Sequence, residues 1–211
     1  MKSLSMTILY LVPVKKVKDR IPEPLKVSEV VPGYTLGGIY AARYSRGKEV
    51  MSEFGLLPAY VQFGDKKGYF TENFCMDNKP AGDGARSGQF KWGGSGKLVT
   101  LDVASGGSGL VSIRMRPIVS NIPFTGTLPF LCLKGTNVVY LQNHMISRIG
   151  ISLSDVDMPD DSPLKSFPFG PKLITVYWDT SNVIYKEPEL AGQRVIQREN
   201  VLGTPMSRSR K

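Results

Sequence analysis

The sequence predicts a mostly β fold, with some α+β character from a few short helices. Its 22 glycines and 15 prolines divide the 211-residue chain into short apolar runs, which favours short strands over long helices. The chain is long enough to bury a sizeable core, and no linker-like stretch divides it. We therefore expect one domain over residues 1–205 and a basic, disordered tail over 206–211.

The first expected elements are a strand, a short helix and a second extended segment. Residues 7–12 form an apolar run typical of a strand, and residues 14–21 place apolar side chains at helical spacing until Pro22 ends the helix. Gly37 and Gly38 lie in the next extended segment. Two glycines inside a strand predict a bulge or a close approach of a neighbouring strand.

The clearest strands come in the middle of the chain. Apolar and polar residues alternate over 99–103 and again over 111–116, so each strand should bury one face. The string GGSG precedes both strands, at 93–96 and 106–109. These glycines predict tight turns rather than a repeat architecture.

Two further strands are expected in the second half of the chain. Residues 138–141 and 174–178 are rich in β-branched and aromatic side chains. A proline-rich irregular connection, residues 159–171, lies between them. The predicted strands are therefore spread along nearly the whole chain.

The positive charge of the chain does not indicate a nucleic-acid partner. The net charge is +9, but basic residues cluster only over 15–20 and at the C-terminal end, 208–211. Phosphate binding needs a larger cluster of Lys and Arg, whereas an anionic carboxylate ligand explains a basic surface equally well. We expect no nucleic-acid and no membrane partner, although a basic surface that binds acidic macromolecules is a third hypothesis.

The cysteines and the single histidine do not indicate a metal site. Cys75 and Cys132 form no CxxC motif, and His144 stands without a matching triad, so we expect no disulfide scaffold, metal or cofactor. The apolar run over 6–14 is short and lacks a cleavage pattern. We interpret it as a strand and expect a cytoplasmic protein.

Four strings, in matching order and spacing, resemble the acetoacetate decarboxylase superfamily. They are PEPL at 22–25, SEFG at 52–55, MDNKPA at 76–81 and the closing segment over 162–185. The resemblance covers most of the chain. It implies a largely antiparallel, barrel-like double sheet that encloses a pocket, and such closure would remove exposed sheet edges.

The resemblance also implies chemistry at a lysine. In that family a neutral lysine amine condenses with the ketone of a β-keto acid, and desolvation or a neighbouring cation lowers its pKa. It implies Lys91 as the catalytic amine and Glu53 as the acid/base. Arg86, expected at the start of a helix, and Phe74 would bind the substrate. Lys97 is the alternative amine.

The spacing around the expected lysines departs from the family pattern. Gly93 and Gly94 fall where an ungapped alignment places the family's lysine pair. Lys91 reaches the position only if two residues are deleted, and Lys97 comes four residues late. In addition, residues 35–38 contain no acid where the family has an earlier glutamate.

Two functions follow from these observations. The first is an acetoacetate decarboxylase-like enzyme, a lyase that acts on a small oxo acid or another carbonyl compound through a lysine Schiff base. The alternative is a lysine-independent protein of the same fold that binds or isomerises a larger apolar small molecule. Members of the superfamily often assemble, so the resemblance allows a homo-oligomer.

Overall fold

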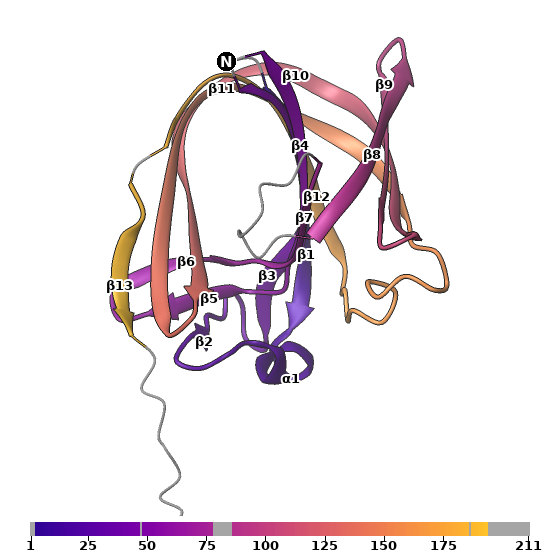
Figure 1. The fold of residues 1–211 in the computed structure, drawn as a ribbon. Helices are drawn as coiled ribbons and strands as arrows, with labels where there is room; N and C mark the ends of the chain where they lie inside the picture. Colours follow the sequence, from indigo (N-terminus) through magenta and orange to yellow (C-terminus); the bar gives the residue numbers. More distant parts are fainter. Residues whose placement is uncertain (1–2, 47, 78–85, 186, 194–211) are drawn as a thin grey trace, which may run out of the picture.

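A computed structural model describes residues 3–46, 48–77, 86–185 and 187–193 (Figure 1). Within these residues the protein is mostly β, as the sequence predicted, with thirteen strands and two short helices. The predicted boundary at residue 205 and the predicted tail over 206–211 lie outside the described residues. None of the helices in the described part of the chain is long and apolar enough to cross a membrane.

The helices are α1 (Val14–Val17) and the 3₁₀ helix η1 (Lys18–Arg20). The strands are β1 (Ser3–Pro13), β2 (Lys26–Val27), β3 (Tyr34–Arg46), β4 (Glu49–Leu57), β5 (Tyr60–Phe63), β6 (Lys66–Phe70), β7 (Glu72–Met76), β8 (Arg86–Ser95), β9 (Leu98–Ser105), β10 (Ser108–Lys134), β11 (Asn137–Asp157), β12 (Lys172–Tyr185) and β13 (Glu189–Gln193).

The strands join into one sheet that closes on itself. The order β11-β12-β1-β3-β4-β7-β8-β9-β10 forms a ring, because β10 also pairs with β11. In Figure 1, the long β10–β11 hairpin arches over the top of the ring and descends beside β13. This arrangement confirms the predicted barrel-like fold. The closure is not complete, since β2 and β13 remain as edge strands in the described sheet.

Local sequence signals account for the helix and the turns. The helical spacing over 14–21 is realised by α1 and η1, with Val17 fully buried and Ile21 nearly so. Gly96 and Gly106 lie at the two predicted hairpin turns, with φ of 59° and 63°. Glycine adopts this left-handed conformation without the steric penalty that a side chain brings.

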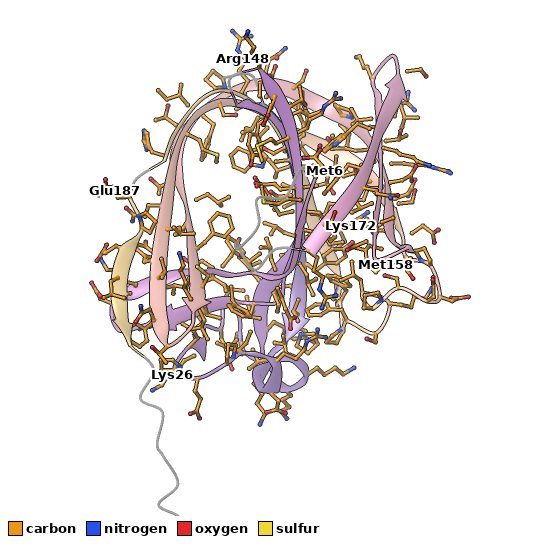
Figure 2. All side chains as sticks on the ribbon, viewed as in Figure 1. Met6, Lys26, Arg148, Met158, Lys172 and Glu187 are labelled. Atoms are coloured by element: carbon orange, nitrogen blue, oxygen red, sulfur yellow. The ribbon has the colours of Figure 1, made fainter. Side chains whose placement is uncertain are left out.

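The core lies between the wall formed by β1, β3 and β4 and the layer formed by β8, β9 and the first part of β10. Ile8, Ile39 and Phe54 from the wall, and Leu101 and Ile113 from the layer, are all fully buried in one cluster. Figure 2 shows how densely side chains fill this region around Met6. The face of β1, β3 and β4 opposite this core is called the Glu53 face below.

Gly38 shows why β1 and β3 approach each other so closely. A Cβ atom added at Gly38 would lie 2.0 Å from the backbone oxygen of Ile8. The pairing of β1 with β3 nevertheless continues through this point without a change of register. Of the two predicted alternatives, the structure therefore has the close approach and not the bulge.

The predicted helical start at Arg86 is wrong. Arg86 is the first residue of β8, and its backbone pairs in parallel with Cys75 of β7. The prediction rested on the resemblance of the local sequence to the family, whereas the pairing with β7 is a tertiary interaction. The partner strand, and not the local sequence, decides the conformation here.

Candidate functional site

Glu53 is held by two tyrosine hydroxyls on the Glu53 face. Tyr40 Oη donates a hydrogen bond to Glu53 Oε1 at 2.7 Å, and Tyr44 Oη donates to Oε2 at 3.2 Å. Strand pairing explains this geometry, because Ala42 is the register partner of Glu53 and the two tyrosines flank Ala42 on the same face of β3. The small side chain of Ala42 lets both hydroxyls reach one carboxyl group.

The environment of Glu53 favours the protonated form of its carboxyl group. Burial raises the pKa of Glu53 above its ordinary value of 4.5, and the hydrogen bonds from Tyr40 and Tyr44 lower it in part. Burial is the larger effect, because removal from water penalises the charged form. A half-buried carboxyl group with a raised pKa is suited to take up and release a proton.

Aromatic rings lead away from Glu53 across the ring of strands. The Tyr40 ring lies 6.4 Å from Phe130, the Phe130 ring 6.4 Å from Tyr69, and the Tyr69 ring 5.1 Å from Tyr60. We call these four residues the aromatic row. Edge-on and tilted arrangements at such distances are favourable for aromatic pairs. The row joins β3 to β10, β6 and β5 and gives the carboxyl group an apolar neighbourhood.

A second aromatic pair lies on the same face. Thr7 of β1 is the register partner of Tyr40, and Trp178 Nε1 donates a hydrogen bond to Thr7 Oγ1 at 3.3 Å. The ring of Phe124 packs 5.1 Å from that of Trp178. The Glu53 face therefore combines one acid with hydroxyl groups and large aromatic rings.

Lys91, the predicted catalytic amine, points away from Glu53. Trp92 Nε1 donates a hydrogen bond to Ser52 Oγ at 3.2 Å, so these two side chains face each other across the core. Lys91 and Glu53 are the chain neighbours of Trp92 and Ser52. Successive side chains of a strand point to opposite faces. Lys91 and Glu53 therefore both point away from this core, on opposite sides of it. Lys91 is exposed and lies opposite Asp102 of β9.

Arg86, predicted to bind substrate beside Glu53, also lies on the other face of the sheet. Arg86 is the register partner of Cys75, which in turn pairs with Phe54 of the core. Glu53 pairs instead with Met76. Paired residues share a face, so the structure does not bring Arg86 and Glu53 together.

The remaining predicted site residues also lie apart from the Glu53 carboxyl or outside the described side chains. Lys97, the alternative amine, is exposed in the turn between β8 and β9. Phe74 lies on β7, but its side chain is outside the described residues. The assignment of a reacting lysine stays a prediction. Sequence reasoning missed Tyr40, Tyr44 and Trp178, whose only signal was an aromatic residue at alternate positions of a strand.

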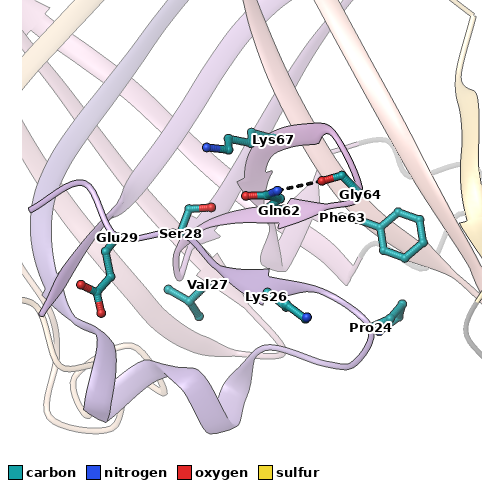
Figure 3. Close-up of a pocket in the computed structure, with 9 residues that line it drawn as sticks. All are labelled: Pro24, Lys26, Val27, Ser28, Glu29, Gln62, Phe63, Gly64 and Lys67. Carbon is teal, nitrogen blue, oxygen red and sulfur yellow. Dashed lines mark hydrogen bonds between the residues drawn. The ribbon is translucent and has the colours of Figure 1, made fainter. Parts of the chain in front are cut away.

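An open groove of about 720 Å³ lies elsewhere, between residues 24–29 and the β5–β6 hairpin (Figure 3). Two of its polar side chains already have local partners: Gln62 Nε2 donates to the Gly64 carbonyl at 2.7 Å, and Glu29 Oε2 accepts from the Gly33 N–H at 3.0 Å. None of the predicted site residues lines it. Among the described residues, no three His, Cys, Asp or Glu side chains gather as a metal site.

Comparison with solved structures identifies the architecture. A structure of acetoacetate decarboxylase matches with a TM-score of 0.65 and 14% identity over 87% of each chain. The chain has the acetoacetate decarboxylase fold. The enzyme from Legionella pneumophila gives 0.63 and 12%, over 92% of this chain and 86% of that one. The enduracididine biosynthesis enzyme MppR complexed with pyruvate gives 0.62 and 12%, over 91% and 89%.

The resemblance in the sequence is thereby confirmed at the level of the fold. No protein-family model matches the sequence, and no curated protein matches it significantly. At 12–14% sequence identity, these comparisons show a shared fold and nothing beyond it. The reaction has to be argued from the side chains on the Glu53 face.

Proposed function

We propose that this protein is a lysine-independent member of the fold that binds a small apolar carbonyl compound on the Glu53 face and isomerises it by proton transfer. The observation that carries the proposal is the Glu53 carboxyl group, held by the hydroxyls of Tyr40 and Tyr44 beside the aromatic row. This arrangement unites an acid/base group, hydrogen-bond donors and apolar contact area at one place.

The proposed step needs only these groups. In a substrate with a carbon–carbon double bond one carbon further along, the Glu53 carboxylate removes a proton from the carbon between the carbonyl and that double bond, and the electron pair moves onto the carbonyl oxygen. As Glu53 takes up the proton, one of the two tyrosine hydroxyls turns its single O–H from the carboxyl group to that oxygen, where the hydrogen bond stabilises the negative charge and lowers the barrier. Protonated Glu53 then returns the proton to another carbon of the conjugated system, so that the double bond has moved and no cofactor is consumed.

Two observations support this reaction over a Schiff base. The exposed Lys91 points away from the Glu53 face, whereas an amine that reacts in a pocket needs desolvation or a neighbouring cation to be neutral. Burial raises the pKa of Glu53 instead, which makes its carboxylate a stronger base. The aromatic row favours an apolar ligand over a highly charged one.

Proton exchange tests the proposal directly. Cyclohexanone, pyruvate and acetoacetate are incubated with the protein in D₂O, and loss of the protons beside the carbonyl is followed by NMR against a protein-free sample. We expect catalysed exchange with cyclohexanone, and a loss of at least about 100-fold in Glu53→Gln. Glu49→Gln is the matched control, because Glu49 is an exposed acid on the same strand.

Borohydride trapping in the same samples separates the two mechanisms. The proposal expects no reduced adduct on any lysine when the modified protein is mapped by peptide mass. An adduct on Lys91 or Lys97, together with exchange that survives Glu53→Gln, would overturn it and support the Schiff-base mechanism. Absence of exchange with all three carbonyl compounds would overturn the isomerase activity as well.

A further inference from the structure

A second, smaller cavity lies on the face of the sheet opposite Glu53. It has a volume of about 200 Å³ and lies between the start of β8, the β9–β10 hairpin and the loop that follows β11. Arg86 and Asp161 contribute opposite charges to its wall, while Ser105 and Ser108 contribute hydroxyl groups. The cavity is therefore small and partly polar, and Cys75, Leu110 and Pro163 form the rest of its wall.

Arg86 lines this cavity together with its buried strand partner, Cys75, which is 1% exposed. Burial raises the pKa of the Cys75 thiol to about 11, and the positive charge of Arg86 partly opposes this effect. The charge of Arg86 thus acts on the Cys75 thiol at the buried end of the cavity.

The loop that carries Asp161 is anchored firmly to β10. The buried Ser162 Oγ donates a hydrogen bond to the Leu110 carbonyl at 2.6 Å and accepts one from the Leu164 N–H at 3.2 Å. The neighbouring Asp160 forms an ion pair with Lys165 at 3.5 Å. Asp160 is thereby directed away, and Asp161 is the acid that faces the cavity.

The two opposite charges of the cavity do not neutralise each other. The ion pairs within the described part of the chain join Arg20 to Glu72, Lys66 to Glu189 and Lys165 to Asp160, so Arg86 and Asp161 are more than 4 Å apart there. A ligand with both charges could bridge them. Ser105 Oγ already donates to the Ser87 carbonyl at 2.8 Å, which leaves its oxygen to accept from a cationic group.

We propose that this cavity binds a small zwitterion of the α-amino acid class. The carboxylate of the ligand pairs with the Arg86 guanidinium, whose geometry suits a bidentate contact. The ammonium group pairs with Asp161 and the Ser105 hydroxyl, and a short side chain packs against Leu110. A cavity of about 200 Å³ accepts an amino acid as small as alanine or serine.

Calorimetric titration with three related probes tests this assignment. L-alanine carries both charges, propionate lacks the ammonium group, and ethylamine lacks the carboxylate. We expect L-alanine to bind, and each single-charge probe to bind at least about tenfold more weakly. Propionate binding as tight as that of L-alanine would overturn the proposal in favour of a plain anion site, and no binding of L-alanine would overturn it outright.

Variants place the ligand in the cavity. Arg86→Gln and Asp161→Asn are each expected to weaken L-alanine binding at least about tenfold, and Arg86→Lys to lose less. Asp160→Asn, next to Asp161 but paired with Lys165, should bind as the wild type does. Circular dichroism checks that each variant folds, which is expected because all three positions are exposed.

The site is independent of the proposed isomerase. Glu53→Gln is expected to bind L-alanine unchanged, because Glu53 and Arg86 lie on opposite faces of the sheet. Loss of L-alanine binding in Glu53→Gln, or wild-type binding in Arg86→Gln, would refute the placement of the amino acid in this cavity.

Discussion

The hydrogen bond from Tyr40 to Glu53 is expected to set the balance between the two protonation states of the carboxyl group. At 2.7 Å the Tyr40 contact has the usual length of a strong O–H···O bond, whereas the Tyr44 contact at 3.2 Å is long. A hydrogen bond to a charged group contributes about 1.5–3 kcal/mol. Tyr40→Phe should therefore penalise the ionised form of Glu53 by about that amount and raise its pKa.

Carbon-13 NMR of the glutamate carboxyl groups measures this effect. The Glu53 signal is identified by its disappearance in Glu53→Gln, and its titration is compared between the wild type and the tyrosine variants. Tyr44→Phe should raise the pKa of Glu53 less than Tyr40→Phe. Tyr34→Phe, an exposed tyrosine on the same strand, should leave it unchanged. A Glu53 pKa that stays the same or falls in Tyr40→Phe would refute the reasoning.

Three further predictions concern Glu53, Gly38 and Cys75. Because burial raises the pKa of Glu53, its stabilising contribution is complete below 4.5 and is lost as the pH rises through the folded-state pKa. The difference in unfolding free energy between Glu53→Gln and the wild type, measured in urea, should therefore shift in favour of Glu53→Gln as the pH rises. A difference that does not change with pH would contradict this. Gly38→Ala should lower the unfolding free energy by about 3 kcal/mol or more, because the new Cβ meets the Ile8 backbone, while Gly93→Ala meets only a side-chain hydroxyl and should cost less. With a thiol pKa of about 11, Cys75 should resist iodoacetamide at pH 8 in the folded protein and react in urea, and rapid labelling without denaturant would show that it is accessible.

Much of the fold could be predicted from local patterns in the chain. Alternation over 99–103 and 111–116 marked β9 and β10, and glycines marked the turns at Gly96 and Gly106. These signals are local, because the period of a strand and the conformation of a glycine turn depend on a few neighbouring residues. The four family-like strings then predicted the barrel-like arrangement that the solved structures share.

The residues that make up the candidate site were harder to predict from the sequence. Glu53 could be singled out as an acid in an apolar stretch, and the structure indeed raises its pKa by burial. Its partners Tyr40 and Tyr44 could not be predicted, because they lie on β3, and the local sequence of neither strand specifies how β3 pairs with β4. Arg86 was expected beside Glu53, and the register of β7 with its neighbours separates the two.

The sequence by itself determined that this chain is mostly β, where several strands turn, and that one acid stands in the apolar stretch SEFG, although the expected short strands are in fact as long as 27 residues in β10 and 21 in β11. Only the tertiary structure decided which side chains share a face. A shift of one residue in strand register moves every side chain to the opposite face, and register is set by packing across the whole ring. For that reason Tyr40 joins Glu53 on one face, while Arg86 joins Asp161 at a cavity on the other.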